Sequence, residues 1–217
     1  MSQNSLFRED LHAGQRQQDP WYYEALLHDQ GFSFVAGVDE VGRGCLAGPV
    51  VAAAVILPFD LSDLGITDSK ALSPLEREAL DKEIRARAVA FSIAQVDSVE
   101  IDRINILQAS LKAMAKAVLS LSPSAAAVLV DGNQSVPNIS LPQKTLTKGE
   151  LRSCSIAAAS ILAKVYRDRL MVKYSMAWPQ YGFERHKGYG TALHRKALEI
   201  YGPSPIHRRS FKGVIPA

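Results

Sequence analysis

The chain has 217 residues, of which 47% are hydrophobic and 22% charged, so its length allows one domain with an appendage and its composition excludes wholesale disorder. No stretch approaches the roughly 18 uncharged apolar residues of a membrane helix, and the N-terminal segment lacks the apolar centre of a secretory signal. The net charge of +3 conceals a basic C-terminal segment, residues 183–217, with seven Lys and Arg against two Glu, which suits a polyanionic partner. We therefore expect a cytoplasmic protein with no membrane segment.

The cysteines and histidines point to neither a disulfide nor a zinc site. Cys45 and Cys154 are too few for a disulfide scaffold, and we expect each to be a small buried hydrophobe in a reducing compartment. The closest pair of histidines, His186 and His194, has none of the spacings typical of zinc ligands.

The hydrophobic pattern predicts an opening helix followed by two neighbouring strands. Asp19 as N-cap and Pro20 at the first helical position predict a helix in DPWYYEALLHDQ. Two apolar runs, 34–39 and 49–57, predict strands, and the glycine-rich segment between them allows the two to pair.

Helices and strands then alternate along the chain. A capping box at Ser73 and Glu76 opens a helix whose apolar side is expected to carry Leu75, Leu80 and Ile84. Further strands are predicted at 90–96, 125–131 and 143–147, and further helices at 97–121, 153–176 and 191–202. The apolar stripe of 104–121 is expected to belong to the core. This order predicts an α/β fold with a sheet of mixed direction.

Acidic residues follow two of the predicted strands. Asp39 and Glu40 end the first strand, and Asp131 ends the strand at 125–131. Because the functional crevice of an open α/β sheet lies outside the carboxyl ends of its strands, we expect these acids to meet there. Glu150, just before the long helix at 153–176, is a candidate fourth acid. Any one of these acids alone is more typical of a solvated turn or a helix cap.

Four converging carboxylates would require a cation or a shared proton. Two unit charges about 4 Å apart repel by roughly 4 kcal/mol at an effective dielectric constant near 20. Mg²⁺ or Mn²⁺ held by carboxylates suits phosphate chemistry, because such an ion lowers the pKa of a water nucleophile and stabilises the leaving oxygen.

A glycine-rich segment directly follows the first acid pair. Gly42 and Gly44 allow backbone amides to approach a ligand closely, and Arg43 between them can bind a phosphate through its planar guanidinium group. The segment GVDEVGRG has neither the dinucleotide-binding nor the P-loop spacing, so those functions lose their main support.

Several motifs in one order, between about residues 33 and 213, resemble prokaryotic ribonuclease HII. These motifs are GVDEVGRGCLAGPVVAAAV (37–55), DSKALS (68–73), IDRINILQAS (101–110), VLVDGN (128–133), SIAAASILAKVYRDRLM (155–171), FERHKGYGT (183–191) and PIHRRSF (205–211). The resemblance implies a ribonuclease H-like fold, with a mixed five-stranded sheet flanked by helices and a helical C-terminal appendage. We accordingly divide the chain into an N-terminal extension with a short helix (1–32), a catalytic core (33–178) and a basic helical segment packed on that core (179–217).

The resemblance also implies an activity and four metal-binding acids. Members of this family cut the phosphodiester on the 5′ side of a ribonucleotide in an RNA/DNA hybrid or in duplex DNA, using two divalent ions and leaving 3′-hydroxyl and 5′-phosphate ends. The motifs place Asp39, Glu40 and Asp131 as the first three acids and Glu150 as the fourth, where the family most often has Asp. This departure leaves Asp168 as an alternative fourth ligand, although its basic neighbours Arg167, Arg169 and Lys164 offer it ordinary ion pairs.

Substrate-binding residues follow from the same motifs. The backbone around Gly42, Arg43 and Gly44 is expected to contact the 2′-hydroxyl and the adjoining phosphate, and Tyr189 to pack on the sugar that follows. Candidates for phosphate contacts or nearby backbone contacts are Lys70, Lys187, Arg208, Arg209 and Asn105.

Two other functions fit the same residues. A structure-specific DNA nuclease on this kind of fold would cut an all-DNA duplex equally well, and a catalytically silent nucleic-acid-binding module would bind through residues 183–217 without a metal-dependent product. The expected partners of the leading hypothesis are RNA/DNA hybrids and ribonucleotide-containing duplex DNA. We expect the protein to act as a monomer.

Overall fold

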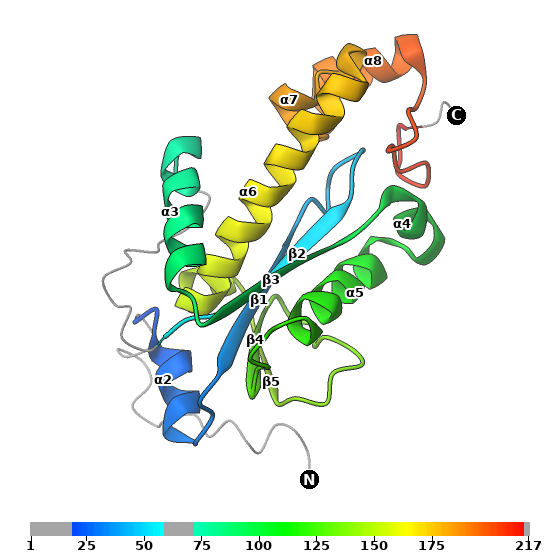
Figure 1. Cartoon of the computed structure of the whole chain (residues 1–217). Coiled ribbons are helices and arrows are strands. Elements are labelled where there is room, and N and C mark those ends of the chain that lie inside the picture. The colour runs from blue at the N-terminus through cyan, green and yellow to red at the C-terminus, as the bar shows by residue number, and fades with distance from the viewer. Residues whose placement is uncertain (1–18, 59–71, 215–217) are drawn as a thin grey trace.

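A mixed five-stranded sheet lies between layers of helices in the computed structural model, which describes residues 19–58 and 72–214 (Figure 1). Its strands are β1 (Val35–Val41), β2 (Val50–Ile56), β3 (Ala90–Val96), β4 (Ala127–Asp131) and β5 (Gln143–Leu146). The strand order is β3-β2-β1-β4-β5; β2 pairs antiparallel with β1 and β3, whereas β4 pairs parallel with β1 and β5. The predicted fold class and its mixed sheet are confirmed.

Helices cover both faces of this sheet. They are α2 (Tyr22–Asp29), α3 (Pro74–Arg87), α4 (Ser98–Ile104), α5 (Ile106–Leu119), α6 (Cys154–Ala177), α7 (Phe183–His186) and α8 (Ala192–Tyr201), with the 3₁₀ helices η3 (Gly149–Leu151) and η4 (Pro179–Tyr181). Side chains alternate along β2, so that Val51, Ala53 and Val55 pack under α6 while Val50, Ala52, Ala54 and Ile56 pack under α5. Figure 1 shows α6 crossing the sheet beside α3, with α4 and α5 on the opposite side.

Close contact between α6 and β1 depends on one glycine. A Cβ atom at Gly37 would lie 2.1 Å from the backbone carbon of Ser155, so a larger residue would push the first turn of α6 away from the sheet. Because side chains two residues apart share a face, Gly37 and Asp39 both face α6. This packing sets the distance between α6 and the end of β1 that carries the acids.

Most predicted boundaries agree with the structure, and the exceptions have local causes. Asp19 is not the N-cap of α2: Trp21 is, and the Asp19 carboxylate accepts a hydrogen bond from the Trp21 amide at 2.9 Å. The capping box that opens α3 is confirmed, but Leu75 is 83% exposed and does not face the core. The predicted helix at 97–121 is two helices, because Asn105 adopts a φ of 68° and caps α5 through the Gln108 amide.

The C-terminal segment packs on the end of α6 and on the loop after β1. Tyr181, Phe183, Leu198 and Val214 form one apolar cluster with Leu46, Ala47 and Met171. Isolated antiparallel bridges join Cys45 to Tyr189 and Ala47 to His207. Segments far apart in sequence are therefore held side by side at the edge of the sheet where β1 ends.

Cys45 and Cys154 are both buried free thiols, as predicted. Across residues 19–58 and 72–214, none of the helices combines the length and the apolarity needed to traverse a bilayer.

Candidate active site

Three of the predicted acids meet at the end of the parallel strand pair. The register pairs Val38 with Val130, so the next residues, Asp39 and Asp131, lie side by side on neighbouring strands. Both line a cleft of about 540 Å³ together with Glu40. The expectation that separate strands deliver these acids to one edge agrees with this geometry.

Burial and neighbouring charges make Asp39 hard to ionise. The residue is only 6% exposed, and this burial, together with the negative charges of Glu40 and Asp131, raises the pKa of its carboxyl well above the ordinary value. Hydrogen bonds from the Ser160 hydroxyl and from the Glu40 amide, the latter at 2.7 Å, oppose the rise. A cation bound at this point would favour the ionised form.

The Glu40 carboxyl lies among the same charges. Burial is the main cause that raises the pKa of its carboxyl to about 7, and the charge of Asp131 adds to the effect. Arg43 opposes it, because its guanidinium group lies 3.3 Å from Glu40 Oε1. The arginine of the glycine-rich loop therefore already touches one of the acids.

Asp131 connects the cleft to the turn that carries Glu150. Its Oδ1 atom accepts a hydrogen bond from the Gly149 amide at 2.6 Å, and Lys148 enters η3 in the left-handed conformation, with a φ of 56°. Glu150 follows immediately, but it is 9% exposed and does not line the cleft. The structure thus brings the turn of the predicted fourth acid next to Asp131 without placing the Glu150 side chain in the cleft lining.

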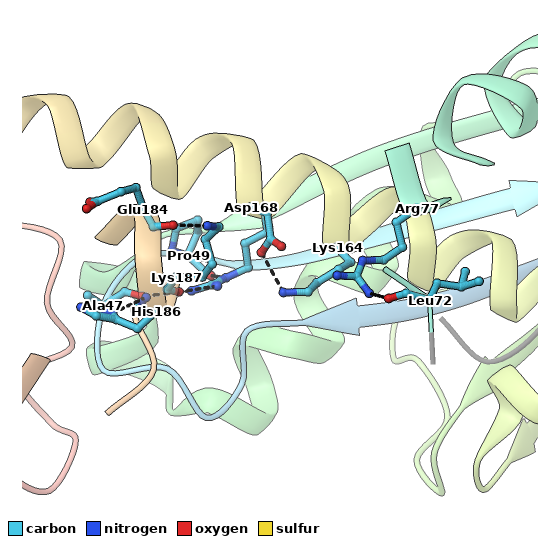
Figure 2. Close-up of polar contacts among 11 residues, drawn as sticks. Ala47, Pro49, Leu72, Arg77, Lys164, Asp168, Glu184, His186 and Lys187 are labelled. Carbon is cyan, nitrogen blue, oxygen red and sulfur yellow. Dashed lines mark hydrogen bonds and ion pairs between the residues drawn. The ribbon is translucent and has the colours of Figure 1, made fainter. Parts of the chain in front are cut away.

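Asp168, the alternative fourth acid, belongs to the neighbouring groove. Its carboxylate pairs with Lys164 at 2.8 Å (Figure 2), and it lines a groove of about 470 Å³ between α3 and α6. Of its three basic neighbours in sequence, only Lys164 forms that pair. Arg169 bonds Glu78 and Asp81, and Arg167 is fully buried.

The acids at the cleft are each engaged with protein donors. Asp39 bonds Ser160 and the Glu40 amide, Glu40 bonds Arg43, and Asp131 bonds the Gly149 amide. Among the described residues, no set of three or more His, Cys, Asp or Glu side chains already stands in an arrangement that would hold a metal ion.

The glycine-rich loop is supported from behind by two buried arginines. Gly42 has a φ of 94°, and a Cβ atom there would lie 2.2 Å from Arg167 Nε, so only glycine fits this close approach. Arg167 donates to the carbonyl oxygens of Ala47, Pro49 and Lys187 at 2.8–3.0 Å (Figure 2).

Arg208 supports the next residue of the same loop. It is fully buried and donates to the carbonyl oxygens of Arg43 at 2.8 Å and Gly48 at 3.0 Å. Burial lowers the pKa of its guanidinium group to about 10. The expectation that Arg208 contacts a phosphate is wrong, because the side chain is enclosed and holds the loop main chain. Arg209 beside it is exposed.

Tyr189 faces the glycine-rich loop across the cleft. It is 42% exposed, lines the cleft with Gly42, Arg43 and Gly44, and is held by the bridge to Cys45. Lys187 lies outside the cleft, on the adjacent groove, where its ammonium group bonds the Glu184 carbonyl (Figure 2). Lys70 lies outside the described residues.

Comparisons with known proteins identify the family. The family model described as Ribonuclease HII matches residues 36–214. Ribonuclease HII of Syntrophotalea carbinolica is 53% identical over 197 residues, covering 90% of this chain and 93% of that protein. The Geobacter metallireducens enzyme is 53% identical over 194 residues, covering 89% and 91%. The chain belongs to the ribonuclease HII family.

Solved structures agree with this assignment. The ribonuclease H2 of Pyrococcus horikoshii superimposes with a TM-score of 0.73 at 28% identity, covering 83% of this chain and 95% of that one. The ribonuclease HII of Archaeoglobus fulgidus, solved in complex with PCNA, gives 0.70 at 27% identity, covering 82% and 95%. As a ribonuclease HII, the chain is a nuclease of the ribonuclease H type and a hydrolase.

Three polar residues of the cleft were missed by reasoning from sequence. Arg77 comes from α3, and Ser160 and Lys164 come from α6. Ser160, Lys164 and Asp168 are spaced four residues apart and so share one helix face. That spacing could have indicated that Ser160 and Lys164 lie on the same side of α6. The position of Arg77 could not be predicted in this way, because it depends on how α3 packs against α6.

Proposed function

We propose that this ribonuclease HII hydrolyses the phosphodiester bond on the 5′ side of ribonucleotides in RNA/DNA hybrids or embedded in duplex DNA, leaving 3′-hydroxyl and 5′-phosphate ends. The observation that carries the proposal is one cleft in which Asp39, Glu40 and Asp131 face the glycine-rich loop and Tyr189. Acids suited to phosphate chemistry thus stand beside groups suited to recognising a sugar. We further propose that the protein acts in the cytoplasm as a monomer, with the catalytic core at 33–178 and the basic segment 179–217 along the duplex.

The donor set fits hard divalent cations. Carboxylate oxygens are the ligands that Mg²⁺ and Mn²⁺ prefer. Burial, with the charge of neighbouring acids added to it, raises the pKa values of Asp39 and Glu40, and a bound cation would favour their ionised forms. We propose Asp39, Glu40, Asp131 and Glu150 as the ligands and catalytic acids for two such ions. When bound, the ions would lower the pKa of the attacking water and neutralise charge on the leaving oxygen.

The protein's own residues position the substrate. The backbone of Gly42, Arg43 and Gly44 is proposed to bond the 2′-hydroxyl and its phosphate, because Arg208 holds the Arg43 carbonyl and the Arg167 side chain packs against Gly42. Tyr189 is proposed to pack on the following sugar, where an extra 2′-hydroxyl would alter the contact.

Basic residues around the cleft are suited to phosphates that are not cut. Lys164 of α6 and Arg77 of α3 line the cleft, and Figure 2 shows their side chains on these two helices. Lys187 lies along the adjoining groove, and Lys70 remains a candidate from sequence. Such contacts would fix the register of the duplex without reading its bases.

Cleavage of defined duplexes tests the proposal. A duplex with one ribonucleotide and an all-DNA control are incubated with Mg²⁺ or Mn²⁺, with and without chelator. The proposal requires cutting only at the ribonucleotide and only with metal. Equal cutting of both duplexes would instead favour a structure-specific DNA nuclease, and salt-sensitive binding without a product would favour a silent binding module.

Conservative amide substitutions test the acids within the same assay. Asp39→Asn and Asp131→Asn should lower turnover by at least about 100-fold, while circular dichroism and duplex binding remain those of the unmodified protein. Full activity in either variant would remove that residue from the proposed metal site.

Substitutions at Tyr189 test the proposed sugar contact. Tyr189→Ala should reduce cleavage at an isolated ribonucleotide more than Tyr189→Phe does, because the ring and not the hydroxyl makes the contact. Equal losses would show that the hydroxyl is the important group.

A further inference from the structure

Three buried histidines lie together beneath Tyr189, although nothing in their sequence spacing groups them. His186 is 8% exposed, His194 is not exposed and His207 is 2% exposed. The His186 and His194 rings stack with centroids 4.4 Å apart and planes 14° from parallel, and the His194 and His207 centroids are 5.1 Å apart. The proposed reaction uses none of these imidazoles directly, because none of them lines the cleft.

The hydrogen bonds determine which nitrogen of His207 carries the proton. The Ser204 backbone amide lies 2.9 Å from His207 Nδ1, and a backbone N–H can only donate, so Nδ1 is an acceptor. The Ser204 hydroxyl, 2.7 Å from the same nitrogen, also donates to it. In the neutral ring the proton is therefore on Nε2, which lies 2.9 Å from His194 Nε2.

His194 is the next member of this chain of hydrogen bonds. Its Nε2 accepts a hydrogen bond from His207 Nε2–H, so its own proton is on Nδ1. That nitrogen lies 3.0 Å from the Tyr189 carbonyl oxygen, which can only accept. A one-directional chain of hydrogen bonds thus runs from Ser204 through His207 and His194 to the main chain of Tyr189.

His186 holds the residue before Tyr189 in the same manner. The Gly188 amide donates to His186 Nδ1 at 3.2 Å, and His186 Nε2 donates to the Tyr181 carbonyl at 2.8 Å. Two stacked imidazoles therefore bond consecutive residues of the segment that carries Tyr189. A second proton on His194, at Nε2, would point at the N–H of His207 Nε2, and two donors cannot bond each other. The chain therefore requires neutral rings.

We propose that His194, oriented by His207, is a positioning residue that fixes the main chain of Tyr189 and thereby sets how strongly the enzyme prefers a deoxyribose after the ribonucleotide. This inference rests on the proposed function, because it assigns a cause to the placement of the sugar-contacting ring. A backbone held from below by a fixed donor leaves the ring less freedom to adapt to an extra hydroxyl group.

Substitution of His194 tests the proposal. His194→Leu removes the donor at similar size, whereas His194→Asn is the matched control, because its amide nitrogen stands where Nδ1 stands. Cleavage is compared on a duplex with one ribonucleotide and on one with two consecutive ribonucleotides. The Leu variant should lose about tenfold in the preference between these substrates, and the Asn variant should keep it within about twofold. Loss of total activity with an unchanged preference would overturn the proposal.

A double variant separates positioning from general structural damage. In a Tyr189→Ala background, His194→Leu should change the preference no further, because the ring that it positions is already gone. If the unmodified protein cuts neither substrate, the proposed function fails. If it cuts the single ribonucleotide and His194→Leu keeps the full preference, only the positioning role fails.

The tautomers can be observed without any variant. ¹⁵N NMR of the imidazoles at neutral pH should show His194 protonated on Nδ1 and His207 on Nε2. A His194 ring protonated on Nε2 or on both nitrogens would overturn the proposal, even if the Leu variant failed to fold.

Discussion

Replacement of Glu40 by glutamine should stabilise the metal-free protein, and the gain should grow with pH. The pKa of Glu40 rises from 4.5 to about 7 on folding, so the folded state holds this proton more tightly than the unfolded state. Between pH 4.5 and 7, the free energy of unfolding therefore falls as the pH rises, and above pH 7 the full cost is present. Glutamine cannot ionise and avoids this cost.

The size of the pKa shift of Glu40 determines how much stability the glutamine variant should gain. A rise from 4.5 to about 7 corresponds to about 3 kcal/mol in the free energy of unfolding. The Glu40 side chain is 10% exposed, so solvent screens it little. Most of this difference should appear between pH 5 and pH 8.

Urea unfolding followed by circular dichroism measures this difference in the presence of chelator. The stability gap between Glu40→Gln and the unmodified protein should widen by about 2 to 3 kcal/mol from pH 5 to pH 8. Glu199→Gln, on an exposed surface pair with Lys196, is the control and should show no such widening. With added Mn²⁺ the unmodified protein should become more stable than Glu40→Gln, because only the unmodified site retains its full set of acids to bind the ion. A gap of the same size at both pH values would refute the reasoning.

Three further predictions follow from other parts of the site. Glu150→Gln should reduce metal-dependent cleavage more than Asp168→Asn, because Asp168 is paired with Lys164 on the neighbouring groove; the reverse order of activities would make Asp168 the fourth ligand. Arg208→Lys should raise KM several-fold and lower Tm, because lysine cannot bond the Arg43 and Gly48 carbonyls as the planar guanidinium does. Arg209→Lys is the exposed control. Equal effects of the two substitutions on KM and Tm would argue against a role of Arg208 in holding the loop. Burial lowers the pKa values of His194 and His207 to about 4; the charges of His186 and Arg195 add to the shift of His194, and those of His194 and His186 add to the shift of His207. The unfolded chain therefore takes up protons first as the pH falls, and stability should decline between pH 6.5 and 4; denaturant titrations of a His194→Asn/His207→Gln variant should show a shallower decline, and an identical slope would contradict the assignment.

Local sequence signals predicted most of the fold because they act over a few residues. The apolar runs at β1, β2 and β4, the capping box at Ser73 and the acidic cap at Asp97 each form with near neighbours in the chain. Errors arose where tertiary packing competes with these signals. Leu75 fits a helical stripe but lies on the outer side of α3.

Some residues of the candidate site could likewise be predicted from local sequence, and others could not. Asp39, Glu40, Asp131 and the glycine-rich loop were found from sequence, because strand ends and glycines mark them locally. The sequence by itself therefore determined the elements, the acids and the family motifs. Only the tertiary structure decided which residues support the site. Ser160 bonds Asp39, Arg167 and Arg208 support the glycine-rich loop, and the histidine chain bonds the main chain of Tyr189. These contacts join segments up to 165 residues apart, so the hydrogen bonds that assign their roles exist only after the chain has folded.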